Sequence, residues 1–272
     1  MNQAPAPREA VLDWLTVVAI AAIAISLTVG LHESVHALTC VVVGGQLREV
    51  SALHAECDSQ TPLQRKLVAG AAPLYNLLAG LLLWAVAHNA LGLTPQGWTF
   101  CWLLASMNLF YGAGYFLLSG VAGIGDLAVV VDGWQPAWLW RVGLVLLGVP
   151  LYAGCVWLAL RTFARRAGGE AEARTRHAKR LGLLSYGTSA GVVALAGLLH
   201  PQGPLGLPAT AGLMAALGAL SPLLYMMRWL RAERFRLRHA QPLEIRRRWS
   251  WAATAVVVVA IYVVVLGRTL YF

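Results

Sequence analysis

The sequence predicts an all-α fold, a polytopic membrane bundle of about six or seven transmembrane helices. Hydrophobic residues make up 58% of the 272-residue chain and charged residues only 12%, which excludes an ordinary water-soluble domain. The apolar residues are also gathered in long runs, and about 20 of them suffice to cross the hydrocarbon core of a bilayer. The runs cover residues 11–43, 66–89, 98–119, 137–163, 181–200, 207–230 and 249–270.

The first run follows the tail MNQAPAPREA, which carries no signal-peptide cleavage pattern. We therefore expect the run to remain in the protein as a membrane helix. It is longer than one straight crossing requires, so the helix should be tilted or extend beyond the bilayer. The next stretch, 44–64, contains GGQLREVSALHAE, whose short apolar-polar alternation predicts a small extramembrane hairpin. An exposed edge of that hairpin could pair with an extended segment of another protein.

The third run is followed by SGVAGIGDLAVVVDGW, which is short and rich in glycine and aspartate. This composition predicts a re-entrant segment or half-helix over 120–136, because irregular backbone at membrane depth is tolerated only where protein or water covers it. Together with the first three runs, it forms a predicted membrane core of residues 1–136. Residues 137–272 contribute the remaining transmembrane helices.

Positive charge is concentrated in two segments, 164–180 and 231–248, whereas the connection HPQGPLGLP between the intervening runs is uncharged. Basic loops of multi-pass membrane proteins face the cytoplasm. The pattern predicts an integral membrane protein, in the cell membrane, with both basic loops cytoplasmic and loop 44–64 outside. The net charge of +9 is then explained by topology, so we expect the lipid bilayer and no nucleic acid as its partner.

The cysteines are scattered along the chain. They lack CxxC spacing and three of the four lie in apolar runs, which argues against a disulfide framework or a zinc ribbon. Cys40 follows His36 by four residues and could bind zinc as a thiolate, but a small buried helix residue is the commoner role of such a cysteine. The four are Cys40, Cys57, Cys101 and Cys155.

The motif HESVH, residues 32–36, places two imidazoles and a carboxylate inside the first apolar run. His32 and His36 are four residues apart and share a helix face, and Glu33 lies one residue around from the first. This HExxH spacing is typical of a zinc site with two histidine ligands and a glutamate general base. A charged carboxylate at bilayer depth costs about 2.5 kcal/mol or more, which a bound divalent cation would offset.

A catalytic zinc takes a third protein ligand, and the chain has only twelve acidic residues from which to choose it. Asp13 is about 30 Å from His32 along the same helix, and the acidic residues of the basic loops lie on the opposite side of the membrane. We prefer Asp126, which follows three glycines at a natural N-cap position, and Asp132 stays open as the alternative. Three outer-loop carboxylates lie close to the first helix together with His54 and Cys57 and could approach the site, but a solvated loop is the interpretation we favour: Glu49, Glu56 and Asp58.

These features resemble the site-2 protease family of intramembrane zinc metalloproteases over roughly residues 25–135. The resemblance rests on HESVH, on GAAPLYNLLAG at the start of the second run, which is similar to the family's Gly-Pro-x-x-Asn pattern, and on an asparagine-containing run followed by an aspartate beside a glycine. Asp132-Gly133 matches the Asp-Gly order of the family, whereas Gly125-Asp126 reverses it. The choice between the two aspartates therefore stays open at this point.

The resemblance implies a zinc metalloprotease that hydrolyses a peptide bond in or near the transmembrane segment of another membrane protein. By that analogy His32, His36 and Asp126 are zinc ligands and Glu33 is the catalytic base. Asn76 and Asn108 would help to hold an extended substrate, with a hydrogen bond between helices as the simpler alternative. Two other classes remain open: a non-catalytic transporter or metal- or proton-path protein, and a zinc-dependent lipid hydrolase.

Overall fold

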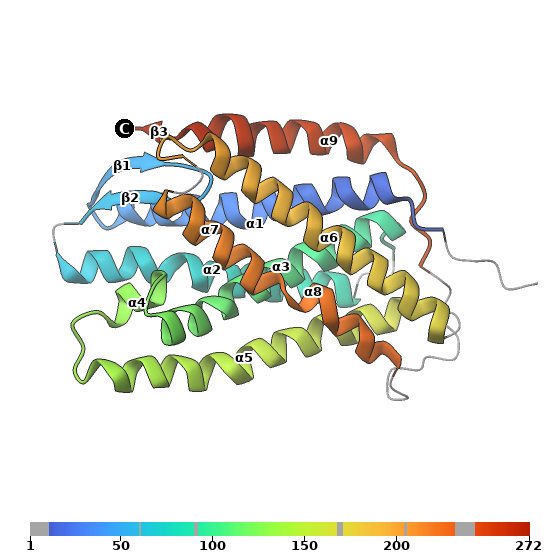
Figure 1. The fold of residues 1–272 in the computed structure, drawn as a ribbon, viewed down its shortest axis with the longest axis horizontal. Helices are drawn as coiled ribbons and strands as arrows, with labels where there is room; N and C mark the ends of the chain where they lie inside the picture. The colour runs from blue at the N-terminus through green and yellow to red at the C-terminus, as the bar shows by residue number, and fades with distance from the viewer. Residues whose placement is uncertain (1–10, 60, 90–91, 168–170, 204–205, 232–242) are drawn as a thin grey trace, which may run out of the picture.

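The helices of the computed structural model run side by side as a bundle, and the structure describes residues 11–59, 61–89, 92–167, 171–203, 206–231 and 243–272 (Figure 1). Within these residues seven helices are long and apolar enough to cross a membrane, so the predicted all-α multi-pass fold is confirmed. The seven spans are Trp14–Val42, Pro62–Asn89, Pro95–Ala122, Ala137–Arg166, Arg174–Leu199, Thr210–Leu230 and Trp249–Arg268.

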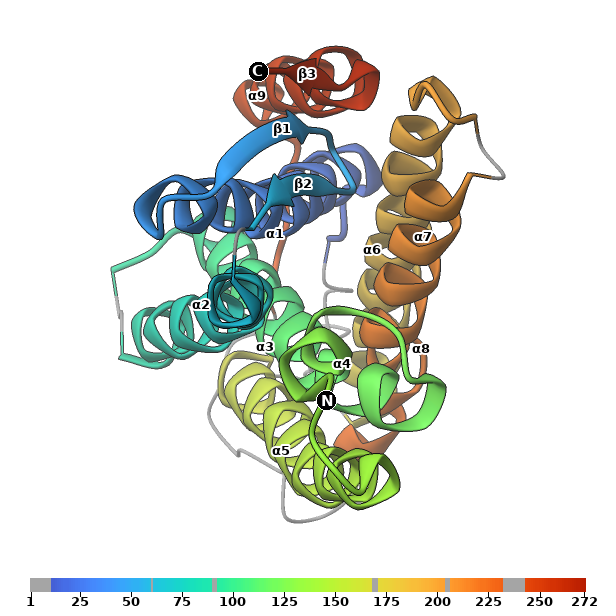
Figure 2. The ribbon, with the colours of Figure 1, turned by 90° about the vertical axis from the view of Figure 1, so that its left-hand side faces the viewer.

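The bundle is built around three helices that carry the sequence motifs. They are α1 (Trp14–Val42), α2 (Pro62–Asn89) and α3 (Pro95–Ala122), followed by the short α4 (Asp126–Val131) and by α5 (Ala137–Arg166). The second half of the chain forms α6 (Ala171–Leu199), α7 (Leu207–Leu220), α8 (Pro222–Tyr225), η1 (Met226–Arg231), α9 (Trp249–Ala260), η3 (Ile261–Val265) and η4 (Leu266–Arg268). In the end-on view of Figure 2, α3 lies between α2 and α5, and α6 and α7 cover one side.

Burial differs between the spans, and α1, which carries the HESVH motif, is among the helices best shielded from lipid. In their most apolar stretches, 72% of α1 residues and 67% of α3 residues are buried inside the protein, but only 22% of those in α5 and in the last span. The outer helices therefore present apolar side chains to lipid, and α1 and α3 are shielded by protein. Polar side chains on α1 can be kept away from lipid only in such a position.

Close contact between α2 and α3 depends on glycine. A Cβ on Gly80 of α2 would lie 2.9 Å from the backbone nitrogen of Leu109, and one on Gly112 of α3 would lie 2.8 Å from the carbonyl oxygen of Pro73. Small residues at such points let the backbones of membrane helices approach one another. The approach brings the polar side chains of the two helices into hydrogen-bonding range.

The helices extend beyond the apolar runs from which they were predicted. The predicted basic loop 164–180 is mostly helical, because α5 ends at Arg166 and α6 begins at Ala171, and only part of the second basic segment lies within the described residues. Charged residues with high helix propensity continue a helix into the polar interface, where apolar side chains are no longer needed. The single run predicted over 207–230 is divided into α7, α8 and η1, with Pro222 opening α8.

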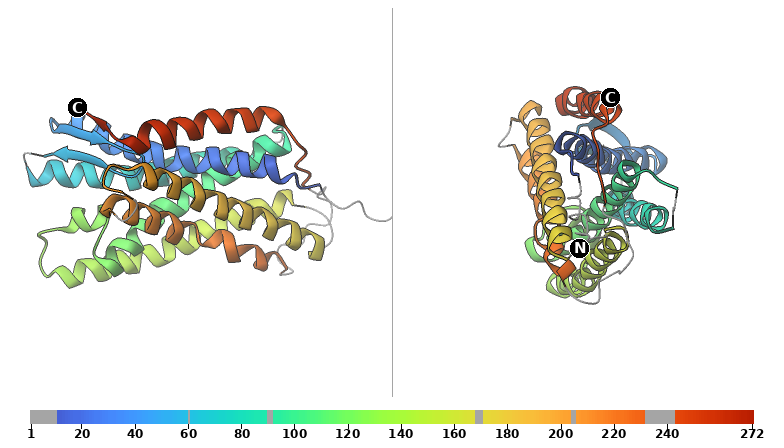
Figure 3. Two further views of the ribbon diagram at one scale, coloured as in Figure 1. Left: turned by 45° about the horizontal axis from the view of Figure 1, so that its top comes forward. Right: turned by 90° about the vertical axis from the view of Figure 1, so that its right-hand side faces the viewer.

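The predicted hairpin is present, with β1 (Gln46–Val50) antiparallel to β2 (Ala55–Asp58). A third strand, β3 (Leu270–Tyr271), pairs with the other side of β1, giving the order β2-β1-β3. This strand was not predicted, since two residues carry no alternation signal. Figures 1 and 3 place the hairpin at the end of the bundle where α1 ends and α4 lies, opposite the end at which α5 gives way to α6.

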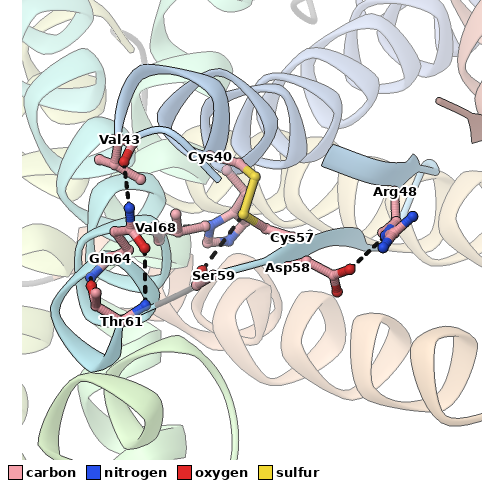
Figure 4. The surroundings of a disulfide bond; sticks show 10 residues. Cys40, Val43, Arg48, Cys57, Asp58, Ser59, Thr61, Gln64 and Val68 are labelled. Carbon is pink, nitrogen blue, oxygen red and sulfur yellow. Dashed lines mark hydrogen bonds and ion pairs between the residues drawn. A yellow bond between two sulfur atoms is a disulfide. The ribbon is translucent and has the colours of Figure 1, made fainter. Parts of the chain in front are cut away.

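The expectation of no disulfide was wrong. Cys40, near the end of α1, is bonded to Cys57 on β2 with a Cα–Cα distance of 5.9 Å (Figure 4). The hairpin folds β2 back over the last turns of α1, and this return of the chain, which brings the two residues together, is not visible in cysteine spacing. Cys40 is therefore not available as a zinc ligand, and Cys101 and Cys155 are free thiols.

Cys57→Ser should lower the free energy of unfolding by about 3 kcal/mol, the value expected when the cross-link of a loop of this size is lost. The measurement is thermal unfolding of the purified protein in detergent, with Cys101→Ser as the control because Cys101 is a free thiol. Equal unfolding temperatures for Cys57→Ser and the unaltered protein would contradict a stabilising disulfide.

Candidate metal centre

The HESVH motif lies on the buried face of α1, one to three turns before the helix ends. The exposed fractions of His32, Glu33 and His36 are 0%, 5% and 7%. The ring of His32 stacks on Tyr115 of α3, with the ring centroids 5.0 Å apart and the planes 12° from parallel. Helix packing thus fixes the imidazole and excludes lipid from it.

Asp126 reaches the two histidines because the chain reverses direction after α3. Gly123 and Gly125 adopt positive φ angles of 70° and 85°, which residues with a side chain rarely adopt. Gly125 is the N-cap of α4 and makes no side-chain capping bond, so the predicted capping position of Asp126 was wrong by one residue. As the first residue of α4, Asp126 leaves its carboxylate available to face α1.

Three ligand atoms converge at this point. Asp126 Oδ2 lies 3.1 Å from His32 Nε2 and 3.3 Å from His36 Nε2, and the two Nε2 atoms are 3.2 Å apart. Zinc at its usual bond lengths holds tetrahedral ligand atoms about 3.3 Å from one another. The three side chains therefore already have the spacing of a zinc site.

The hydrogen bonds on the far side of each ring determine which nitrogens carry protons. His36 Nδ1 lies 2.8 Å from the carbonyl oxygen of Val68, which can only accept a hydrogen bond. His32 Nδ1 lies 2.6 Å from Asn76 Oδ1, and the amide nitrogen of Asn76 donates to Asn108. Both Nδ1 atoms therefore donate, and in the neutral rings both Nε2 atoms present lone pairs to each other and to the carboxylate.

Three facing lone pairs repel one another unless a proton or a metal ion lies between them. Asp126 Oδ2 is buried and receives no hydrogen bond from the described residues, and an unsatisfied buried polar atom is costly. A cation bound by two imidazoles and one carboxylate removes the repulsion, and this ligand set suits zinc.

The other aspartate that the sequence left open lies elsewhere. Asp132 is exposed, its carboxylate forms an ion pair of 2.6 Å with Arg65, and its carbonyl oxygen accepts a hydrogen bond from Lys66. The structure thus groups Asp126, and not Asp132, with the two histidines. The sequence had favoured Asp126 as well, because the chain has few acidic residues and most of the others could be excluded as ligands.

Asn76 and Asn108 link α2 and α3 to the motif helix. Asn76 Oδ1 accepts a hydrogen bond from His32, and Asn76 Nδ2 donates one to Asn108 Oδ1 at 2.8 Å. Asn108 Nδ2 in turn donates to Thr28 Oγ1 at 3.2 Å and to the carbonyl oxygen of Leu104 at 2.8 Å. Both asparagines are buried. They are positioned to orient the His32 ring, and their predicted contact with substrate stays a prediction.

Asn76→Ala should weaken zinc binding about 10- to 100-fold, because a ligand histidine that loses its outer hydrogen bond is free to change tautomer and orientation. Competition with a chromogenic zinc chelator measures the change. Asn89→Ala is the matched control, since Asn89 is on the same helix but bonds to the carbonyl oxygen of Ala85. An unchanged zinc affinity in Asn76→Ala would show that the ring is held by packing alone.

A cavity of about 750 Å³ opens beside the candidate metal centre. Glu33, His36 and Asp126 line it on one side, the hairpin covers another, and α7 contributes Gly212 and Ala215. Two tyrosines of α3 that the sequence did not single out, Tyr111 and Tyr115, are also part of its wall. They lie one helical turn apart, but in an apolar span they look like ordinary core residues.

Comparison with protein-family models, with curated proteins and with solved structures finds no match to this chain. The family resemblance noted from the motifs therefore stays a prediction. A functional conclusion has to be drawn from the chemistry of the site.

Proposed function

We propose that this protein is an intramembrane zinc metallopeptidase that hydrolyses a peptide bond in or near the transmembrane segment of another membrane protein. The observation that carries the proposal is the group of three ligand atoms from His32, His36 and Asp126, with Glu33 beside it in the same cavity. Two imidazoles, one carboxylate and a neighbouring glutamate are the parts needed for metal-assisted hydrolysis. Their burial among membrane helices supports a substrate that is itself in the membrane.

Each side chain has a definable task in such a reaction. Zinc, when bound, supplies Lewis acidity that brings the pKa of a water molecule close to neutrality. The Glu33 carboxylate takes the proton from the attacking water and returns it to the amine nitrogen as the C–N bond breaks. His32 and His36 are held from behind by Asn76 and Val68, so the ligands need not reorient during the reaction.

The hairpin supports the binding of an extended substrate. Ala55, Glu56 and Cys57 of β2 line the cavity, and in the described sheet β2 pairs only with β1, so its other edge is unpaired. A transmembrane helix has its carbonyl groups in hydrogen bonds and must unwind before hydrolysis. The unwound segment could then add to the edge of β2 as a further strand.

The Cys40–Cys57 bond supports an orientation with the hairpin outside. Disulfides persist in oxidising compartments, and the segments rich in arginine favour the cytoplasm. The cavity would then open at the outer half of the cell membrane.

The experiment is reconstitution of the purified protein in liposomes together with an extracted membrane-protein fraction. We expect zinc-dependent appearance of new peptide N-termini, mapped by mass spectrometry to transmembrane segments, and their loss after zinc is removed by a chelator. Zinc flux into the vesicles without new N-termini would instead support a transporter. Release of fatty acid or headgroup from the lipid would support a lipid hydrolase.

A further inference from the structure

A second group of metal-ligating side chains lies at the hairpin, apart from the centre described above. The ligand atoms of Glu49, His54 and Glu56 all lie within 4.8 Å of one another. All three residues line the 750 Å³ cavity. The group comes from β1, the turn and β2, whereas the first centre comes from α1 and α4.

The two glutamates are direct cross-strand partners. Glu49 on β1 is in register with Glu56 on β2, so their side chains point to the same face of the hairpin. Like charges in this relation destabilise a strand pair. Among the described residues, neither carboxylate has an arginine or lysine partner, and the ion pair of the hairpin joins Arg48 to Asp58 instead. A cation bound between the glutamates would remove the repulsion.

His54 is held in position by the turn that joins the strands. Its carbonyl oxygen accepts hydrogen bonds from both the backbone nitrogen and the hydroxyl of Ser51, at 2.7 and 2.9 Å. The same turn is anchored to the last span, where Tyr262 donates to the carbonyl oxygen of Ala52 at 3.1 Å. These hydrogen bonds fix the backbone of His54, so its imidazole is held close to the carboxylates of Glu49 and Glu56.

A fourth side chain belongs to the same region. His200, just after α6, is only 4% exposed, and its Nε2 has no hydrogen-bond partner among the described residues, whereas its Nδ1 accepts from the backbone nitrogen of Gln202. Gln202 lines the same cavity as Glu49, His54 and Glu56, so His200, which is hydrogen-bonded to Gln202, lies beside that cavity. A buried imidazole nitrogen without a partner favours a ligand at this place.

We propose that Glu49, His54 and Glu56, supported by His200, form a second zinc site at the rim of the cavity. Carboxylate oxygens and imidazole nitrogens are a ligand set that zinc accepts. A zinc ion here would link β1 to β2 and the hairpin to the end of α6. It would bind more weakly than the first site, because Glu56 is exposed to solvent and must be ordered on binding.

The test is a zinc titration of untagged, metal-free protein in detergent with zinc chloride, followed by calorimetry and by metal analysis after gel filtration. We expect two classes of site in the unaltered protein. The double variant Glu49→Gln, His54→Ala should lose the weaker class or bind it at least about 10-fold less tightly, and it should keep the tighter one. His88→Ala, which removes a histidine from the other end of α2, and Asp58→Asn, which removes a hairpin carboxylate, should keep both.

One class of site in the unaltered protein, lost in His36→Ala, would overturn the second site and leave the proposed function intact. Equal weakening by His88→Ala or Asp58→Asn would also overturn it, because it would indicate unspecific binding. Conversely, a single class that survives in His36→Ala but is lost in the double variant would support the rim site and contradict the first centre. The two proposals therefore fail in distinguishable ways.

Discussion

Glu33→Gln should abolish peptide hydrolysis and leave zinc bound. Glutamine has nearly the same size as glutamate but cannot accept the proton of the attacking water, and general-base catalysis alone contributes about 10²- to 10⁴-fold. The ligand atoms of His32, His36 and Asp126 are untouched by the substitution. The ratio of kcat for the two proteins, measured with the same reconstituted substrate, gives the loss.

A matched control for this variant is Asp58→Asn. Asp58 is an exposed carboxylate paired with Arg48, so its neutralisation changes the net charge by the same amount but leaves the cavity as it is. We expect full activity in the control. If Glu33→Gln retains both zinc and full activity, Glu33 is not the base and the mechanism is wrong.

Asp126→Ala should lower zinc affinity by a factor of about 100 or more, whereas Asp132→Ala should leave it unchanged. The first substitution removes one of three ligand atoms and leaves only the two imidazoles of α1. The second removes an exposed ion pair with Arg65, which contributes about 1 kcal/mol or less to stability. Zinc analysis of both proteins after dialysis against a weak chelator measures the difference.

The reverse outcome, zinc lost in Asp132→Ala and kept in Asp126→Ala, would contradict the arrangement of α4 seen in the structure. Asp126→Asn tests whether the negative charge of the ligand matters, because asparagine keeps an oxygen that can bind zinc but carries no charge. We expect this variant to bind zinc with intermediate affinity.

The transmembrane bundle and half of the candidate metal centre could be predicted from the sequence because both depend on local patterns. Apolar length identifies the spans, and the i, i+4 spacing of His32 and His36 determines that they share a helix face. Asp126 was reached by excluding other carboxylates, an argument that works only because the chain has so few. The alternation in 44–64 was sufficient to predict the hairpin.

The remaining features depend on how distant segments pack. The bond between Cys40 and Cys57 requires the hairpin to fold back on α1, and the hydrogen bond from His32 to Asn76 requires α2 and α3 to meet through glycines. Neither contact leaves a periodic signal in the chain. The position of Asp126 within α4 was missed by one residue because Gly125, with its positive φ, takes the N-cap position and the helix begins at Asp126.

X-ray absorption at the zinc edge, on protein loaded with one equivalent of zinc, tests the central claim most directly. The structure leads us to expect a spectrum of two imidazole nitrogens with oxygen ligands and without sulfur, and its loss at the same zinc loading in His36→Ala. A sulfur ligand, or an identical imidazole signal in His36→Ala, would contradict a zinc centre built from His32, His36 and Asp126.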